Sequence, residues 1–429
     1  MLSAMTDDAF VLDHRCKSFP LAAPPCRADQ LAARGWNVLA HDMAYPLATL
    51  RRSALRHNLA WMQDFAQRKG VHLAPHGKTT MSPELFGMQL QAGAWGLTFA
   101  TVFQLGVGVA AGARRAIIAN QVLGDADLDG LAALLAQHAG LRVWFLVDSL
   151  AQLALIEDWA RRRRFGGRLD VLLEIGIPGK RTGVRTQADA LSLARAVARS
   201  PAVRLGGIEC YEGNAANCDS EHDVREVSAL LRRVAETVRA CDAEQLFAES
   251  EILLSAGGSA VFDLVVPLLR TRDLSRPVRG VLRSGCYLTH DHGNYRRYLA
   301  QVERREGLDA SLRPALEVWA QVQSVPEPGL ALLTCGRRDI SYDLEMPMPV
   351  RFAPHAARVA ADAPAGWKIT ELNDQHAYLR FDPAGDAVLG VGDRVALGIS
   401  HPCTTFDKWG WMAVIEDDGA ISGAIRTCF

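Results

Sequence analysis

Eight short apolar runs recur between residues 71 and 285, and each is followed by a segment with helical periodicity. Near-continuous apolar strands that alternate with helices are typical of a parallel sheet covered on both faces. Most runs begin roughly 20–35 residues apart, as strand–helix units require. The pattern predicts an α/β fold, a (β/α)8 TIM-type barrel, with a doubly wound open sheet as the alternative. The runs are 71–76, 95–100, 115–120, 141–148, 169–176, 204–211, 251–258 and 278–285.

The pattern changes after about residue 310, where prolines and short alternating segments such as 376–381 and 394–399 replace the strand–helix units. Short alternating runs between turn residues are typical of antiparallel strands. We therefore assign residues 45–310 to the barrel. Residues 1–44 and 311–429 are assigned to a smaller, mainly β domain.

Composition narrows the class of protein. The 429 residues are 49% apolar and 22% charged with a net charge of −1, which is typical of a soluble protein and does not favour nucleic-acid binding. The basic run 161–164 follows an apolar-periodic segment and is predicted to be a solvated helix C-terminus. No uninterrupted apolar stretch reaches the roughly 18 residues of a membrane span.

The nine cysteines are scattered, odd in number and without a C-x-x-C pair. This usage indicates reduced thiols and a cytoplasmic location. Residues 1–10 lack the basic start and apolar core of a signal peptide.

Gly77-Lys78-Thr79 suggests a nucleotide phosphate loop, but the spacing excludes it. In the P-loop motif G-x-x-x-x-G-K-[ST], another glycine lies five positions before the glycine of the triplet. In this sequence that position is His72. Lys78 therefore needs another explanation, either as a solvated surface lysine or as a group that does chemistry.

Polar residues follow the predicted strands, at the end of a barrel where active sites form. Loops after the last two strands often bind phosphate, because glycine amides and serine hydroxyls donate to it. A single Gly-Gly-Ser is also a common tight turn. Two such turns, with a lysine after the first strand, describe pyridoxal phosphate held by Lys78 as a Schiff base. The post-strand residues are Lys78, Arg181, Gly183, Tyr211, Glu212, Asn214, Gly257–Ser259 and Ser284–Tyr287; Asp148-Ser149 is predicted to cap the next helix.

His401 and Cys403 form the second candidate constellation. In an extended chain, residues two apart point the same way, and Pro402 between them suggests a strand edge or bulge. Imidazole and thiolate suit Zn²⁺, and an incomplete ligand set suggests a catalytic site, although structural packing explains many such pairs. His290 and His292 are a rival metal pair, while neighbouring polar residues favour a hydrogen-bonded loop there.

Together the motifs PHGKT, KRTGV, GGS, SGCY and HPC resemble the D-serine dehydratase and D-threonine aldolase family of pyridoxal-phosphate enzymes, which has the alanine racemase barrel of fold type III. The resemblance implies that Lys78 is the catalytic lysine and that His401 and Cys403 bind zinc. The family signature usually reads K-T-H-K, whereas this sequence has Lys78-Thr79-Thr80-Met81. The cofactor contacts it implies are His76, Lys78, Arg181, Tyr211, Gly257, Gly258, Ser259, Ser284, Gly285, Cys286 and Tyr287.

The function implied is a dehydratase that converts a D-β-hydroxy amino acid, such as D-serine or D-threonine, into a 2-oxo acid and ammonia. Cys403 favours the dehydratase branch, because the aldolase branch has aspartate at that position. The alternatives are a metal-dependent D-threonine-type aldolase, a non-catalytic cofactor carrier, and a racemase using Tyr342 or Tyr378 as second acid/base. Related barrels are dimers, so we expect a homodimer with no nucleic-acid or membrane partner.

Overall fold

The predicted apolar runs form the parallel strands of one sheet in the computed structural model, which describes residues 10–429. The strands pair in the order β4-β11-β10-β9-β8-β7-β6-β5, and a parallel bridge between His76 and Thr98 joins the two ends. The sheet is a nearly closed barrel, so the (β/α)8 prediction is confirmed and the doubly wound alternative is wrong. The strands are β4 (His72–Leu73), β5 (Leu97–Phe99), β6 (Arg115–Gln121), β7 (Arg142–Val147), β8 (Leu169–Ile175), β9 (Val203–Cys210), β10 (Ile252–Ala256) and β11 (Val278–Leu282).

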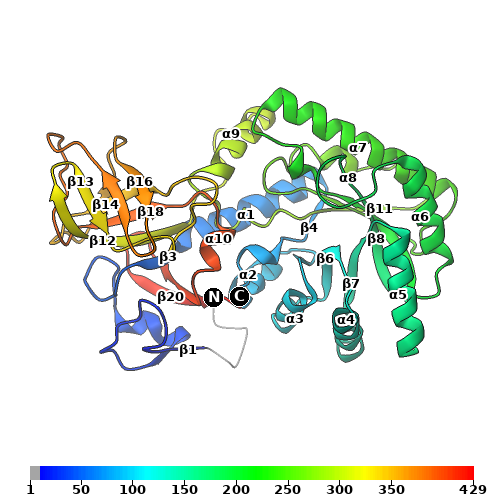
Figure 1. Cartoon of the computed structure of the whole chain (residues 1–429), viewed down its shortest axis with the longest axis horizontal. Helices are drawn as coiled ribbons and strands as arrows, with labels where there is room; N and C mark the ends of the chain where they lie inside the picture. Colours follow the sequence, from blue (N-terminus) through cyan, green and yellow to red (C-terminus); the bar gives the residue numbers. More distant parts are fainter. Residues whose placement is uncertain (1–9) are drawn as a thin grey trace.

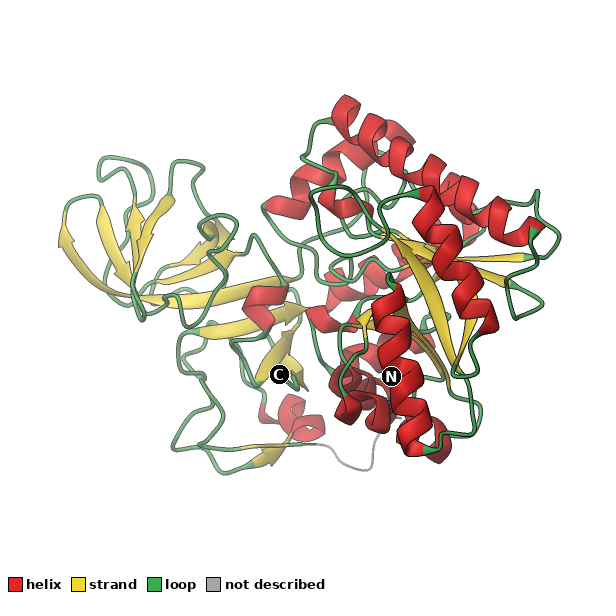
Figure 2. Ribbon diagram, turned by 45° about the vertical axis from the view of Figure 1, so that its right-hand side comes forward, coloured by secondary structure: helices red, strands yellow, loops and turns green. Residues whose placement is uncertain are grey.

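Helices surround this barrel, whereas the other lobe consists mainly of strands and loops (Figure 2). Ser149 caps α5 as predicted, since its Oγ accepts a hydrogen bond from the Gln152 amide at 3.3 Å. The helices of this lobe are α1 (Arg52–Lys69), α2 (Pro83–Gln91), α3 (Val102–Ala110), α4 (Asp125–Gln137), α5 (Leu150–Arg163), α6 (Gln187–Arg199), α7 (Ser220–Ala243), α8 (Val266–Leu269) and α9 (Asn294–Glu306).

The interior of the barrel is packed at one end and polar at the other. Trp144 packs against Trp95, with ring centroids 5.5 Å apart, in a buried cluster that includes Leu172 and Val281. This apolar plug fills the barrel as side-chain layers do in such folds. The carboxyl ends of the strands are left to carry the polar site.

The second lobe is a ten-stranded, largely antiparallel sheet. Strand β3 pairs with β12 and β19 of this sheet, although it lies within the range 45–310, so the chain enters the barrel at α1. Its elements are β3 (Leu47–Arg51), β12 (Leu316–Glu327), β13 (Leu330–Leu333), β14 (Met348–Ala353), β15 (Ala361–Asp362), β16 (Lys368–Leu372), β17 (Ala377–Arg380), β18 (Arg394–Gly398), α10 (Cys403–Phe406), β19 (Trp411–Ile415) and β20 (Ile421–Arg426).

The N-terminal segment lies against the second lobe (Figure 1). It contains β1 (Val11–Leu12), β2 (Cys26–Arg27) and the 3-10 helix η1 (Ala28–Arg34). Its apolar side chains bury a cluster with Trp319 and Trp411 of the second sheet. Residues 1–9, on which most of the signal-peptide expectation rests, lie outside the described residues.

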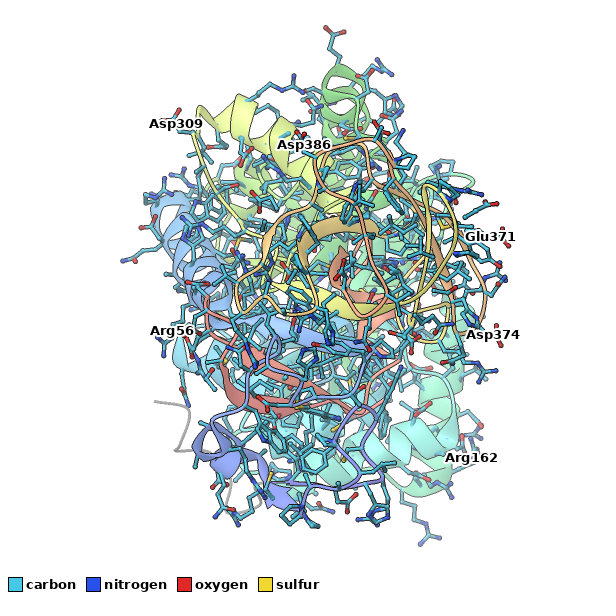
Figure 3. All side chains as sticks on the ribbon, turned by 90° about the vertical axis from the view of Figure 1, so that its left-hand side faces the viewer. Arg56, Arg162, Asp309, Glu371, Asp374 and Asp386 are labelled. Atoms are coloured by element: carbon cyan, nitrogen blue, oxygen red, sulfur yellow. The ribbon has the colours of Figure 1, made fainter. Side chains whose placement is uncertain are left out.

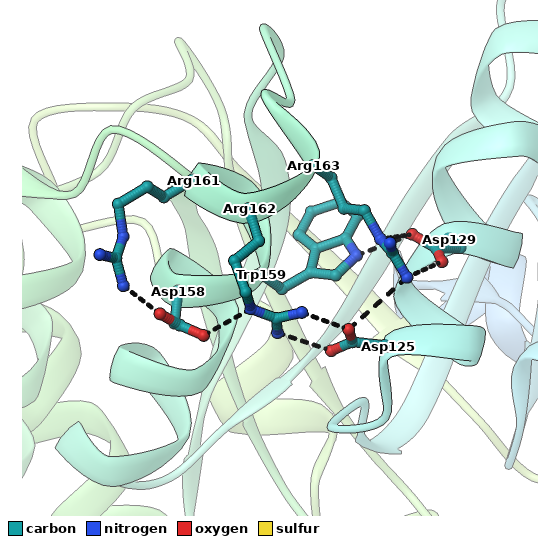
Figure 4. Close-up of polar contacts among 7 residues, drawn as sticks. All are labelled: Asp125, Asp129, Asp158, Trp159, Arg161, Arg162 and Arg163. Carbon is teal, nitrogen blue, oxygen red and sulfur yellow. Dashed lines mark hydrogen bonds and ion pairs between the residues drawn. The ribbon is translucent and has the colours of Figure 1, made fainter.

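The basic run ends α5 as predicted. Arg161, Arg162 and Arg163 lie in the last turn of the helix and pair with aspartates of α4 and α5 (Figure 4). Charged side chains such as Arg162, Glu371 and Asp374 project from the molecule in Figure 3. The arginines at positions 161–163 are neutralised by these neighbouring aspartates, so they do not form a polyanion-binding surface.

Two further expectations from composition can be compared with the structure. No helix between residues 10 and 429 combines the length and the apolar character needed to cross a membrane. All nine cysteines are free thiols, as the scattered spacing predicted.

Candidate active site

Lys78 lies in a one-turn 3-10 helix, η2 (Gly77–Thr79), directly after β4. Gly77 is required there, because a Cβ atom would lie 2.7 Å from the Phe99 ring and 2.9 Å from the Phe86 ring. The glycine lets the turn pack tightly on the apolar layer, so the lysine side chain is directed to the open mouth of the barrel. The glycine of the G-K-T triplet therefore serves packing, in agreement with the exclusion of a P-loop.

A cavity at the mouth brings six predicted cofactor residues together. It encloses about 560 Å³ of space not filled by atoms, part of it open to solvent. The predicted residues on its wall come from the loops after four different strands, which is how barrel active sites are assembled. Those six are His76, Lys78, Arg181, Tyr211, Gly257 and Gly258; the wall also includes Ala100, Ala119, Asn120, Glu174, Glu209 and Arg283.

The turn after β10 already binds an anion from the chain itself. The amides of Gly257 and Gly258 donate to the Glu212 carboxylate at 3.0 and 2.6 Å. Glu212 is fully buried, and burial raises its pKa although these amides lower it. This contact shows that the two amides suit an anion, and it also shows that Glu212 is their partner in this structure.

The turn after β11 lies against the first. The Ser284 hydroxyl donates to the carbonyl of Gly258 at 2.9 Å, and the Cys286 amide donates to the Ser259 hydroxyl at 3.1 Å. Gly285 is also constrained, since a Cβ atom would approach the His76 carbonyl oxygen to 2.5 Å. The two predicted phosphate turns and the lysine turn are thus in direct contact.

Five of the eleven predicted cofactor residues, Ser259, Ser284, Gly285, Cys286 and Tyr287, do not line the cavity, and Tyr287 is held by a partner of its own. Its side chain is 3% exposed, and its hydroxyl accepts a hydrogen bond from Gln89 at 3.3 Å. Burial raises the pKa of this phenol further above its ordinary value. Its position makes Tyr287 a packing residue behind the turn.

Arg181 lies over the ring of Tyr211, with its guanidinium carbon 4.6 Å from the ring centroid. Such a cation–π contact holds the exposed arginine side chain at the cavity rim. Tyr211 is half-buried, and burial raises its pKa to about 12, so the phenol stays protonated.

A buried charge network forms the floor of the cavity, and no sequence motif predicted it. Arg283 pairs with Glu209 at 2.7 Å, and these side chains are only 5% and 1% exposed. Glu174 accepts hydrogen bonds from Gln121 at 2.6 Å and Thr182 at 2.8 Å. Burial raises the pKa of Glu209 to about 7, although Arg283 opposes that shift. The floor therefore combines one fixed cation with carboxyl groups whose pKa values are raised by burial.

The metal pair is close together, but the chain between the two residues is not extended. Pro402 is helical (φ −58°, ψ −45°) and Cys403 begins α10, so the predicted strand edge or bulge is wrong. Proline suits the first turn of a helix, where its missing N–H costs nothing. The His401 and Cys403 side chains remain close enough that the thiol raises the pKa of the imidazole and the imidazole lowers the pKa of the thiol.

Two flanking groups orient the pair. His401 Nδ1 lies 2.6 Å from the Asp343 carboxylate, an arrangement that directs the other ring nitrogen outward as in metal-binding histidines. The Cys403 sulfur lies 3.4 Å from the hydroxyl of Thr79, which belongs to the same short turn as Lys78. Burial would lower the pKa of His401, but Cys403 and Asp343 raise it to about 9.

The rival pair, His290 and His292, lies in the loop that leads into α9. His290 Nδ1 bonds to the carbonyl of Asp291, and the Asp291 carboxylate accepts the amides of Gly293 and Tyr295 at the start of α9. Burial lowers the pKa of both histidines, to about 3 and about 4. This loop is a helix-capping structure, as its polar residues suggested.

The residues present fit both groups that the motifs suggest. His76 Nδ1 is buried without a hydrogen-bond partner, and it lines the same cavity as the amine of Lys78, so an added polar ligand would satisfy it. Imidazole and thiol are the donors that zinc prefers. Between residues 10 and 429, no set of three histidine, cysteine or acidic side chains is already arranged around a metal position.

Comparison with known proteins places the two lobes in described families. Residues 50–277, more than half of the chain, match the model "Alanine racemase, N-terminal domain". Residues 315–415 match the model "Putative serine dehydratase domain".

Two curated relatives and one solved structure illustrate the similarity. D-threonine aldolase from Arthrobacter sp is 28% identical over 373 residues, covering 87% of this chain and 89% of that protein. D-threo-3-hydroxyaspartate dehydratase from Delftia sp. (strain HT23) is 26% identical, covering 88% and 95%. The structure of D-threonine aldolase from Filomicrobium marinum superposes with a TM-score of 0.75 at 24% identity, covering 92% of this chain and 97% of that chain. That last match shows the fold.

Proposed function

Because the chain belongs to the alanine racemase N-terminal domain family and its second lobe matches the serine dehydratase model, we propose that it is a pyridoxal-phosphate- and zinc-dependent dehydratase of D-β-hydroxy amino acids. Its relatives include enzymes named for both aldol cleavage and dehydration of such substrates. The observation that supports the proposal is the 3.4 Å contact between the Cys403 sulfur and the hydroxyl of Thr79, the residue that follows Lys78 in the same turn.

Lys78 is the residue we assign to the cofactor aldehyde and then to proton transfer. When bound, pyridoxal phosphate delocalises negative charge at the substrate Cα, and zinc acts as a Lewis acid at the β-hydroxyl. Lys78 Nζ takes the proton from Cα, His401 and Cys403 hold the metal, and Arg181 with Tyr211 lines the cofactor side of the cavity. Ser259 and the turn 284–286 bind phosphate in this proposal, while Glu212 keeps the Gly257 and Gly258 amides.

Dehydration and aldol cleavage differ in the bond that breaks. Loss of the β-hydroxyl gives a 2-oxo acid and ammonia, whereas Cα–Cβ cleavage gives glycine and an aldehyde. We favour dehydration because Cys403 stands where the aldolase branch has aspartate, and a thiolate suits zinc better than the harder metals.

A product panel tests this assignment. The full-length protein, loaded with cofactor and zinc, is incubated with D- and L-serine, D- and L-threonine and D-threo-3-hydroxyaspartate, with ammonia and aldehyde measured in parallel. We expect ammonia and a 2-oxo acid from the D isomers alone. Glycine with an aldehyde would assign the aldolase, and cofactor binding without turnover would assign the carrier. Racemisation would point to Tyr342 or Tyr378, neither of which lines the cavity.

We also propose that the protein is a cytoplasmic homodimer, in which a second copy covers the barrel mouth. Phe103, Leu123 and Leu150 follow β5, β6 and β7, and they are 64%, 49% and 52% exposed. Tyr342, Leu344 and Met346 of the second lobe are 42%, 48% and 41% exposed. Large exposed apolar side chains gathered at one end of a barrel are typical of an interaction surface.

The Phe103→Glu and Leu344→Glu variants should therefore weaken self-association, because each would place a charge in an apolar interface. Light scattering after size exclusion would report a shift from dimer to monomer. Val359, which is 80% exposed, offers the matched control, since Val359→Glu should leave the dimer intact. A monomeric wild-type protein would contradict the proposal.

A further inference from the structure

Two thiols from different lobes face each other at the site. Cys286 follows β11 of the barrel, and Cys403 begins α10 of the second lobe. Their sulfur atoms are 3.9 Å apart. The Thr79 hydroxyl lies 3.7 Å from the Cys286 sulfur and 3.4 Å from the Cys403 sulfur, so the three side chains meet at the turn that contains Lys78.

The spacing of the sulfurs matches a shared metal. With Zn–S bonds of about 2.3 Å and tetrahedral angles, two thiolates on one zinc ion are separated by roughly 3.8 Å. A disulfide requires about 2.05 Å, so the observed pair is far from that arrangement. The lobes therefore hold the two sulfurs, without a bond between them, at the edge length of a zinc tetrahedron.

Ordinary packing explains this pair less well. A buried free cysteine usually behaves as a small apolar side chain among apolar neighbours. Here Cys286 is 4% exposed, yet its sulfur lies within 4 Å of two polar groups, the Thr79 hydroxyl and the Cys403 thiol, at 3.7 and 3.9 Å. Two neighbouring sulfurs that share a hydroxyl partner are a ligand environment.

We propose that Cys286 is a third protein donor to the metal held by His401 and Cys403. The inference rests on the metal pair of the proposed function and extends it. Catalytic zinc sites commonly have three protein ligands and one open position, and a Cys2His set is among those used. The three side chains are not already arranged around one metal position, so in this proposal His401 would turn the ring nitrogen that Asp343 leaves free toward the two sulfurs. Two sulfur donors would also favour zinc over magnesium or manganese.

The proposal gives Cys286 two separate tasks. Its backbone amide bonds the Ser259 hydroxyl at 3.1 Å on the predicted phosphate turn, while its side chain points to the metal pair. Cys286 alone would thus connect the phosphate end of the cofactor, through its backbone, to the metal, through its side chain. That link is absent if position 286 serves only through its backbone.

X-ray absorption of the zinc-loaded wild-type protein counts the sulfur donors without any substitution. We expect two sulfur neighbours at about 2.3 Å. One sulfur neighbour would overturn the role of Cys286 and leave the His401–Cys403 pair of the proposed function intact. No bound zinc would overturn both, so the two failures are distinguishable.

Cobalt substitution then assigns the second sulfur to a residue. Chelator-treated full-length protein is titrated with Co²⁺, and the sulfur-to-cobalt charge-transfer band is measured. Cys286→Ser and Cys403→Ser should each lower the band to roughly half, since the band scales with the number of thiolates. Their zinc affinity should fall by more than about 100-fold.

Cys241, fully buried in α7, is the matched control. Cys241→Ser should keep both the band and the zinc affinity of the wild type. Circular dichroism and retained cofactor absorbance establish that each variant is folded. A folded Cys286→Ser variant with the wild-type band and zinc affinity would refute the proposal, and if that variant does not fold, the sulfur count in the wild type decides.

Discussion

Replacement of Lys78 by alanine is expected to reduce turnover by about 10³-fold or more, the largest loss of activity from any single change in the chain. The amine of Lys78 lies on the wall of the cavity, and we assign it to both cofactor attachment and proton transfer. The variant should also lose the absorption band of lysine-bound cofactor. Absorbance and ammonia release, measured on the same sample, check both losses.

Lys180, an exposed lysine in the loop after β8, is the matched control for this change. Lys180→Ala should keep the band and most of the activity, because that side chain does not line the cavity. A persistent band in Lys78→Ala would assign the cofactor to another lysine and would remove the basis of the proposed mechanism.

The barrel was predictable from sequence because its strands are buried on both faces. Leu169–Ile175 is buried at every position and is apolar except at Asp170 and Glu174, so it reads as a near-continuous apolar run. β4 is the weakest case, since only His72 and Leu73 form a regular strand and His76 joins the sheet through a single bridge. Periodicity located that strand because the chain remains extended and buried up to the lysine turn.

The floor of the site was not predictable by the same rule. Glu174, Glu209 and Arg283 lie within or directly after apolar runs, and each is a single charge among buried residues. Their positions at the carboxyl ends of β8, β9 and β11 could have identified them, because a charge there faces the mouth of a barrel. Their mutual pairing depends on strand order and register, which a single sequence does not contain.

The contacts among the loops could not be predicted from the sequence, for a different reason. Thr79, Cys286 and Cys403 meet although 207 and 117 positions separate successive members. Thr79 matches the second residue of the family signature K-T-H-K, which this sequence departs from only at Thr80 and Met81, and its hydroxyl touches both sulfurs. Likewise Glu212 was noted only as a residue closing β9, and its capture of two glycine amides follows from three-dimensional packing.

The buried ion pair gives the largest expected effect on stability. Arg283→Met should lower the free energy of unfolding by about 3–5 kcal/mol near neutral pH, because it leaves Glu209 buried without its counter-ion. The double variant Arg283→Met/Glu209→Gln should lose less than the single variant, since no unpaired charge is then left at this pair. Urea unfolding of the wild type and the variants measures these differences.

The loss should depend on pH, with a sign fixed by the pKa of Glu209. Burial raises that pKa from 4.5 to about 7, so the stability contributed by its proton is complete below the unfolded value and is lost as pH rises through about 7. Removal of Arg283, which lowers this pKa, raises it further; Arg283→Met should therefore cost less at about pH 5 than at about pH 8. Arg338→Ala, which breaks an exposed pair with Asp374, should cost under about 1 kcal/mol. An equally small and pH-independent loss in Arg283→Met would mean that Glu209 is protonated in the folded protein across this range and that the pair carries no net charge attraction.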